Sequence, residues 1–287
     1  MMYDWFMGRE LNPRVTLPLL GETDIKVFME LRPGITGWLL LNCAFIAKQY
    51  RTFGFVTDSI IFISIVQAVY IIDSQIMEPA ILTTIDITTD GFGLMLSFGD
   101  LAWVPFVFSM QTRYLSVHPV SLGWVGLAVM SGLLATGFSI FRLANTEKNT
   151  FRTKPDDPSV AHLKYIETET GSRLLVSGWW GTARHINYLG DWIQSWSYCL
   201  PTGITGYMIL TAGTGAEGAF KMADGREVVP GAAKGWGMIF TYLYIVYLAV
   251  LLIHRDGRDE EKCAKKYGEA WKEYTRIVKW RIVPGIY

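Results

Sequence analysis

Residues 114–141 read YLSVHPVSLGWVGLAVMSGLLATGFSIF, a stretch of 28 residues in which the only titratable charge is that of His118. A helix needs about 20 apolar residues to cross the hydrocarbon core of a bilayer. Helices of soluble proteins keep a charged face, and this stretch has none. The stretch therefore predicts a membrane-spanning helix, with a break at His118-Pro119.

Four further uncharged runs support a membrane protein. They contain 15, 14, 25 and 19 residues, at 33–47, 59–72, 192–216 and 235–253. Hydrophobic residues make up 51% of the chain and charged residues only 18%, against about 25% charged in a typical soluble domain. We therefore predict an all-α fold, a polytopic transmembrane helical bundle. A large soluble α-helical core is the alternative that the missing charged faces disfavour.

Charge and cysteine content exclude other classes of protein. The chain has 26 basic and 26 acidic residues, so no excess of positive charge indicates a nucleic-acid partner. Cys43, Cys199 and Cys263 lie far apart and form no CxxC pair. Neither a zinc site nor a disulfide scaffold is therefore predicted, and we expect no metal.

Two parts are distinguished along the chain. Residues 1–144 are predicted to be membrane helices, although they carry acids close to apolar runs, namely Asp73, Glu78, Asp86, Asp90 and Asp100. Ionisable groups at membrane depth usually face a cavity or a partner, and we expect this above all of Asp73 and Glu78. Residues 145–287 contain polar segments. The nine Lys and Arg between Arg255 and Arg281 predict a cytosolic position for that segment.

Polar and aromatic side chains gather in the second part. A hairpin is predicted at 168–175 around Gly171-Ser172, followed by the densest cluster, Arg184, His185, Asn187, Tyr188 and Asp191, beside two tryptophans. Helical spacing then places Arg255, Asp259, Cys263 and Lys266 on one face, and Tyr267 and Tyr274 are expected to continue that register. A solvated amphipathic helix is the simpler interpretation of the same spacing.

One motif is not expected to bind a nucleotide. Gly213, Gly215 and Gly218 match G-x-G-x-x-G, but a dinucleotide fingerprint needs a βαβ unit around it, and the flanks here are membrane-like. We interpret the motif as a glycine-rich loop.

The chain resembles the sterol reductase family, which includes delta-14 and delta-7 sterol reductases and the sterol-reductase half of the lamin B receptor. The resemblance rests on motifs in matching order, GRELNPR (8–14), ELRPG (30–34), DITTDGFG (86–93), FGDLAWVP (98–105), residues 174–192, RDEEKC (258–263), KYG (266–268) and PGIY (284–287). The amino-acid sequence at 86–93, 149–164 and 279–284 is most similar to that of the delta-14 branch.

The resemblance implies NADPH-dependent reduction of a carbon–carbon double bond of a sterol by a multi-pass protein of the endoplasmic reticulum membrane. The partners would be a sterol and membrane lipid. Residues 1–144 would form the sterol side, and 145–287 a cytosol-facing cofactor pocket. The family's cofactor-binding residues fall on Lys148, Arg152, Leu175, Trp180, Asn187, Tyr188, Asp259, Cys263, Ala264, Lys265, Lys266, Tyr267 and Tyr274.

A mechanism follows for the C14=C15 bond. An isolated double bond does not accept hydride, so protonation at C15 must first give a cation at C14, and a positioned acid is needed in a dry pocket. The resemblance points to Tyr70 and Asp259. A phenol alone is a weak acid, but a neutral carboxyl could supply the proton through it. Tyr70 is expected to point into the bundle.

The resemblance also shows two departures. Family members carry more membrane helices before the motif at 8–14, so we expect the C-terminal part of a longer protein or a short variant. About 30 residues, roughly 209–237, are extra relative to the family and are either a loop insertion or a retained non-coding segment. Alternatives are delta-7 or C24 sterol reduction, an inactive sterol-binding or scaffold homologue, and a membrane isoprenylcysteine methyltransferase. The last typically has proline after Arg-His, where this chain has Ile186.

Overall fold

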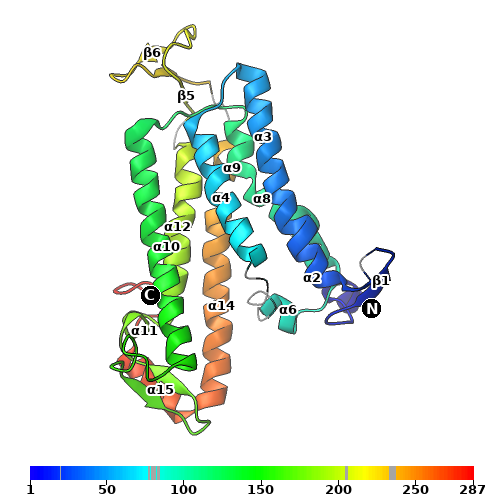
Figure 1. Cartoon of the computed structure of the whole chain (residues 1–287), viewed down its shortest axis with the longest axis vertical. Coiled ribbons are helices and arrows are strands. Elements are labelled where there is room, and N and C mark those ends of the chain that lie inside the picture. Colours follow the sequence, from blue (N-terminus) through cyan, green and yellow to red (C-terminus); the bar gives the residue numbers. More distant parts are fainter. Residues whose placement is uncertain (20, 77, 79–81, 83–84, 204–205, 233–236) are drawn as a thin grey trace. The chain divides into compact units, whose positions relative to one another are not determined.

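The computed structural model describes residues 1–287 except positions 20, 77, 79–81, 83, 84, 204, 205 and 233–236 (Figure 1). The chain forms two compact units, each built from two segments. Unit 1 contains Met1–Leu127 and Tyr198–Tyr244, and unit 2 contains Ala128–Ser197 and Ile245–Tyr287. These bounds differ from the division at 144/145, which remains a prediction about function.

Three helices in the described part of the chain are long and apolar enough to cross a membrane. They are α4 (Asp58–Ile76), α10 (Gly123–Thr153) and the segment Ile239–Tyr267, which contains α14 (Leu243–Tyr267). This confirms a mainly helical protein of membrane type. The helix expected from residues 114–141 begins only at Gly123, because the chain turns at His118-Pro119 after α9 (Met110–Leu115).

Unit 1 is mostly helical. Besides α4 and α9 it contains α1 (Met2–Met7), α2 (Ile25–Met29), α3 (Gly37–Phe53), α6 (Ile85–Thr89), α7 (Leu94–Phe98), α8 (Val104–Phe108) and α13 (Gly237–Thr241). Segments Glu30–Thr36 and Gly99–Trp103 are π-helical. Strands β1 (Arg14–Leu17) and β2 (Gly21–Asp24) form an antiparallel pair. The small sheets are an addition to the predicted all-α fold.

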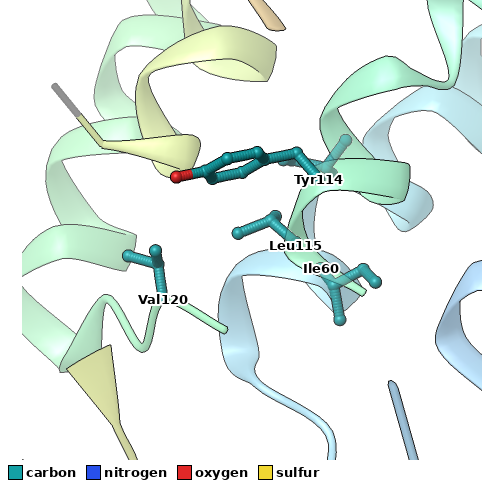
Figure 2. Packing of buried hydrophobic residues seen from close by; sticks show 5 residues of the cluster. Ile60, Tyr114, Leu115 and Val120 are labelled. Carbon is teal, nitrogen blue, oxygen red and sulfur yellow. The ribbon is translucent and has the colours of Figure 1, made fainter. Parts of the chain in front are cut away.

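The apolar core of unit 1 lies where α4 and α9 meet (Figure 2). Ile60 and Ile63 of α4 pack with Tyr114 and Leu115 of α9, and Val120 joins them from the following loop. Ile60, Ile63 and Leu115 are completely buried. The cluster explains why a helix as short as α9 is ordered, because packing stabilises short helices that would be marginal alone.

A buried polar network links α3, α4 and α9 in the same unit. The Gln67 Oε1 atom accepts hydrogen bonds from Trp38 Nε1 (3.1 Å) and Asn42 Nδ2 (2.7 Å), and the Thr112 hydroxyl donates to Asn42 Oδ1 (2.7 Å). Buried polar groups are costly unless they are paired, so this network fixes the three helices in one arrangement. It also fixes the indole of Trp38.

The uncharged run 192–216 does not form one apolar helix. Helix α12 (Ile186–Cys199) ends early, and a 3₁₀ turn follows at Leu200–Thr202. Pro201 cannot continue an α-helical hydrogen-bond ladder, and Gly203 adopts a φ of 84°. The absence of charged residues shows that 192–216 is apolar, but it does not determine the conformation of the backbone.

Residues 208–229 form a three-stranded sheet within unit 1. Strand β7 (Glu227–Val229) lies between β5 (Met208–Leu210) and β6 (Phe220–Lys221). Ile209 is hydrogen-bonded through its backbone to Pro119 and Ser121, so the sheet is attached to the loop before α10. Positions 233–236 of the segment interpreted as an insertion lie outside the described residues.

The glycine-rich motif of this segment lies in turns between β5 and β6. Gly213, Gly215 and Gly218 have φ angles of 80°, 70° and 73°. A dinucleotide fingerprint opens a helix after a parallel strand, whereas here the neighbouring strands are antiparallel. The interpretation as a glycine-rich loop is confirmed.

Unit 2 is built on α10, α12 and α14, followed by α15 (Glu269–Ile277). The short helix α11 (Trp179–Thr182) precedes α12. Strands β3 (Tyr165–Glu167) and β4 (Arg173–Leu175) form an antiparallel hairpin whose turn contains Gly171 at φ 74°. This confirms the hairpin predicted around Gly171-Ser172.

Two glycines allow α10 and α12 to approach closely within unit 2. A side chain on Gly137 would collide with the backbone of Gln194 and Gly190. A Cβ on Gly190 would lie 2.5 Å from the backbone nitrogen of Phe141. Small residues at such crossings let backbones touch, a usual way for helices to pack in membranes.

Replacing Gly190 with valine is expected to destabilise unit 2, because the added carbons meet rigid backbone rather than a movable side chain. Overpacking of this kind costs about 1–3 kcal/mol. The measurement is thermal unfolding of the detergent-solubilised chain. Gly132→Val on the partner helix α10 is the control, since in the described part of the chain nothing lies within 4 Å of a Cβ at that position. Equal unfolding temperatures for the two variants would contradict the close packing at Gly190.

Candidate functional site

A groove in unit 2 collects most of the residues to which the resemblance assigned cofactor binding. It is formed by the C-terminal end of α10, strand β4, helix α11, the beginning of α12, the polar half of α14, and α15. Elements distant in the sequence thus contribute to one site. The hairpin and α15 are held together by an apolar cluster of Trp271, Tyr274 and Val278 with Ile166 and Leu174.

Two adjoining cavities make up this groove. One has a volume of about 110 Å³ and the other of about 280 Å³. They share Lys148, Arg152, Trp180, His185 and Asp259. Each is smaller than the usual pocket for a drug-sized molecule, so a long ligand would lie along both.

Ten of the thirteen predicted cofactor-binding residues line the groove. They are Lys148, Arg152, Leu175, Trp180, Asn187, Tyr188, Asp259, Cys263, Tyr267 and Tyr274. Ala264, Lys265 and Lys266 are exposed on α14 and do not line it. The role of all thirteen in binding remains a prediction.

Lys148 and Trp180 form the floor shared by the two cavities. The Lys148 ammonium lies 3.6 Å from the centre of the Trp180 ring, and Trp180 Nε1 donates to the backbone oxygen of Ala144 at 2.7 Å. Trp180 is only 4% exposed. The buried indole holds the Lys148 ammonium by a cation–π contact.

Glu147 fixes the entry into α11. Its Oε1 atom accepts from the backbone N–H of Trp179 at 2.9 Å. A Cβ at Gly178 would lie 2.5 Å from the same carboxyl group, and Gly178 adopts a φ of 67°. Glycine is favoured there because other residues rarely adopt this backbone angle, and a side chain would also displace the Glu147 carboxyl group. This contact places Trp180 relative to α10.

The aromatic end of the groove comes from three rings. Trp271 lies 4.9 Å from Tyr274 and 6.3 Å from Tyr267, measured between ring centres. The expectation that Tyr267 and Tyr274 share a helical register is wrong, because α14 ends at Tyr267 and Gly268 turns the chain with a φ of 51°. Burial raises the pKa of the Tyr274 phenol well above its ordinary value, so this hydroxyl keeps its proton.

Glu260 joins the aromatic end to the Arg-His element. Its Oε1 atom accepts from Trp271 Nε1 at 2.9 Å, and its Oε2 atom lies 3.4 Å from Arg184 Nη1. Arg184 is largely buried and Glu260 is 30% exposed, so the ion pair is partly shielded from water. The pair holds Arg184 at the wall of the groove.

His185 lies at the wall of both cavities and was not among the predicted site residues. Burial, together with the positive charges of Lys148, Arg184 and Arg281, lowers the pKa of His185 to about 3. Its Nε2 atom is 3.4 Å from Asp256 Oδ1, which opposes that shift, but Arg281 shares the same carboxylate. Burial and the three cations outweigh the carboxylate, so the imidazole is neutral at physiological pH.

The other predicted residues near the start of α12 have defined contacts. The Tyr188 ring stacks on the His185 ring at 4.7 Å with an angle of 12° between planes. The Asn187 Nδ2 atom donates to Asn145 Oδ1 at 3.3 Å. Helix α12 begins at Ile186, so Arg184 and His185 belong to the turn before it.

Several residues that line the groove were not predicted from the sequence. These are Asn145, Asn149, Phe151, Arg173, Leu174, Arg184, His185 and Trp271. Arg184 and His185 were visible as part of the dense polar cluster. Arg173 reaches the groove from the hairpin, and no spacing in the sequence relates it to α10 or α14.

The groove is suited to an anionic ligand with flat rings. Lys148, Arg152, Arg173 and Arg184 supply positive charge along it, and guanidinium groups bind phosphate in a bidentate way. Tyr188 on one side and the Trp271 group on the other supply aromatic surfaces. Among the described residues, no group of three or more His, Cys, Asp or Glu could hold a metal ion.

Tyr70, the other predicted catalytic residue, belongs to unit 1. It lies on α4 with its ring 6.0 Å from the Trp38 ring. Its side chain is 50% exposed, so the expectation that it points into the bundle is wrong. The buried face of α4 carries Ile60, Ile63, Gln67 and Ile71, and Tyr70 lies at the edge of that face.

The acidic residues of unit 1 have different surroundings. Glu78 pairs with Arg32 at 3.1 Å, which satisfies the expectation of a partner. Asp73 is exposed, but it too has an interaction partner, as expected. Asp100 is buried and Asp90 half-buried, whereas the side chain of Asp86 lies outside the described part.

Comparisons with known proteins agree with the resemblance noted in the sequence. The profile of the ergosterol biosynthesis ERG4/ERG24 family matches residues 1–287. The chain is 68% identical over 287 residues to a Delta(14)-sterol reductase of Neurospora crassa, and 67% identical over 287 residues to Delta(14)-sterol reductase ERG24A of Gibberella zeae. It is 47% identical over 288 residues to Delta(14)-sterol reductase erg24 of Schizosaccharomyces pombe.

Each alignment covers the whole of this chain and 59% of the relative. The chain thus spans about three fifths of the length of these curated relatives. The family profile matches the whole chain, and the sequence identity to these three relatives reaches 68%. These two findings establish the family. This chain belongs to the ergosterol biosynthesis ERG4/ERG24 family.

Proposed function

We propose that this chain carries the cofactor-binding part of an NADPH-dependent sterol reductase that acts on the C14=C15 double bond of sterol intermediates in the endoplasmic reticulum membrane. The single observation that carries the proposal is the groove of unit 2, which combines four cationic side chains with aromatic surfaces. The curated relatives named Delta(14)-sterol reductase supply the choice of substrate.

The residues of the groove fit NADPH by their chemistry. A dinucleotide carries a pyrophosphate, and NADPH carries a further phosphate on one ribose, so several cations are needed. Lys148, Arg152 and Arg173 are available for these groups, and Asn187 and Asp259 can hold ribose hydroxyls or a carboxamide. Tyr188 and Tyr267 can pack on flat rings.

The protein's part in the reaction is to place a proton at C15 and to stabilise the cation that forms at C14. NADPH, when bound, supplies the hydride that adds to C14. Proton and hydride together saturate the double bond, so atoms and charge balance. We propose Asp259, in the groove, and Tyr70, on α4, as the groups that hold and deliver the proton. Trp38 supports the Tyr70 ring, and Lys148 and Arg152 bind phosphate.

Sterol profiling tests this function. A yeast strain deficient in delta-14 reductase should lose its C14-unsaturated sterols when it expresses this chain. Accumulation of delta-7 or C24 unsaturated sterols in matched strains, relieved by the same protein, would instead assign one of those reductions. No change in any sterol, despite normal NADPH binding, would indicate a sterol-binding or scaffold homologue.

Replacing Arg152 with alanine is expected to weaken NADPH binding by about 10–100-fold, because a charge-assisted hydrogen bond to phosphate is lost. NADH binding should change less, since NADH lacks the ribose phosphate. The measurement is titration of both cofactors into the detergent-solubilised chain. The control is Arg276→Ala on α15, an exposed arginine outside the groove. Equal wild-type affinity for the two cofactors would refute NADPH as the cofactor.

A further inference from the structure

The most unusual polar group outside the cofactor-binding set is Asp256 on α14. Its side chain is completely buried. The Oδ2 atom lies 2.6 Å from Arg281 Nε and accepts from the Tyr287 hydroxyl at 3.2 Å, and the Oδ1 atom is 3.4 Å from His185 Nε2. Apolar side chains would stabilise the fold as well as these buried ions do. The buried ionic group around Asp256 therefore indicates a role other than stability.

The segment that provides Arg281 and Tyr287 is folded tightly on itself. The backbone N–H groups of Arg281, Ile282 and Val283 all donate to the backbone oxygen of Tyr287, at 2.8, 3.0 and 3.0 Å. The Arg281 guanidinium also lies 5.4 Å from the centre of the Tyr287 ring. Arg281 and Tyr287 are therefore presented to Asp256 as one rigid pair.

The same segment is attached to the Arg-His element by its backbone. Arg184 N–H donates to the Trp280 oxygen at 2.9 Å, and His185 N–H donates to the Arg281 oxygen at 2.7 Å. Main chain and side chain thus hold His185 from two directions. His185 in turn stacks on Tyr188, and both rings line the groove.

We propose that Asp256, Arg281 and Tyr287 form a positioning cluster, which fixes the His185–Tyr188 ring pair so that it packs against a flat ring of the bound cofactor. None of the three lines the groove, so they act through His185. The His185 imidazole presents its Nε2 atom to Asp256 at 3.4 Å, which defines the orientation of the ring. The proposal rests on the proposed function for the identity of the ligand.

The test uses Tyr287→Phe, which removes one hydroxyl, and Arg281→Lys, which keeps the charge and removes the fixed guanidinium geometry. We expect each to raise the KM for NADPH about three- to tenfold, with kcat changed less than twofold. Tyr50→Phe is the control, because this exposed tyrosine lies on α3 in unit 1. It should leave both constants unchanged.

Hydrogen exchange of the Arg184 and His185 amides provides a readout that requires no cofactor. These amides should exchange faster in both variants than in the wild type, at equal unfolding temperature. A lower unfolding temperature with unchanged KM and unchanged local exchange would overturn the proposal and leave a purely structural cluster. If the wild type fails to bind NADPH, the proposed function fails, and local exchange still decides the cluster: faster exchange supports it and unchanged exchange overturns it.

Discussion

Replacing Asp259 with asparagine is expected to lower the rate of sterol reduction by about 10²–10⁴-fold, the usual contribution of a positioned general acid. Asparagine has nearly the same shape but cannot give up a proton at neutral pH. Asp259 lines both cavities of the groove beside Lys148 and Arg152, so NADPH binding should weaken as well, although by less. Single-turnover reduction at saturating NADPH separates the two effects.

Glu261→Gln is the matched control, because Glu261 is an exposed acid two residues further along α14. It should reduce sterol at the wild-type rate. An Asp259→Asn protein that loses only cofactor affinity, with an unchanged single-turnover rate, would remove Asp259 from the proton pathway. It would then be a binding residue alone.

Local sequence signals predicted the parts of this structure that depend on neighbours in the chain. The glycine pair of α10 and α12 is different, because Gly137 and Gly190 stand 53 positions apart and only the packed helices show their contact. The hairpin around Gly171 follows from a turn residue between apolar strands. The end of α12 at Cys199 follows from Pro201, a local signal that the absence of charge in 192–216 obscured.

In the candidate site too, features set by neighbours in the sequence were predicted, and features set by tertiary packing were not. Helical spacing correctly placed Asp259 and Cys263 on one face of α14, and both line the groove. Spacing could not predict that Gly268 would end that helix and bring Tyr274 back through α15. Nor could it pair Asp256 with Arg281, since charges distant along the chain meet only through tertiary packing. The resemblance supplied residue identities, whereas their hydrogen bonds required the structure.

Asp259 and Tyr70, the two residues proposed to deliver the proton, have different surroundings, so their substitutions should have different effects. Asp259 lies in a groove with cations, so its loss affects binding and chemistry together. Tyr70 belongs to unit 1 and is not among the residues that line the groove, all of which belong to unit 2. A substitution at Tyr70 should therefore report on the chemical step alone.

Replacing Tyr70 with phenylalanine is expected to lower sterol turnover at least tens-fold and to leave NADPH affinity nearly unchanged. The phenyl ring keeps the contact with Trp38, whose indole is held by Gln67, so only the hydroxyl is lost. The measurement is kcat with the sterol, beside a direct NADPH titration. Tyr50→Phe on α3 is the control for loss of a tyrosine hydroxyl in the same unit. Near-normal turnover of the Tyr70 variant would leave Asp259 or an ordered water as the donor to C15, because a group that transfers the proton cannot be removed without slowing that step.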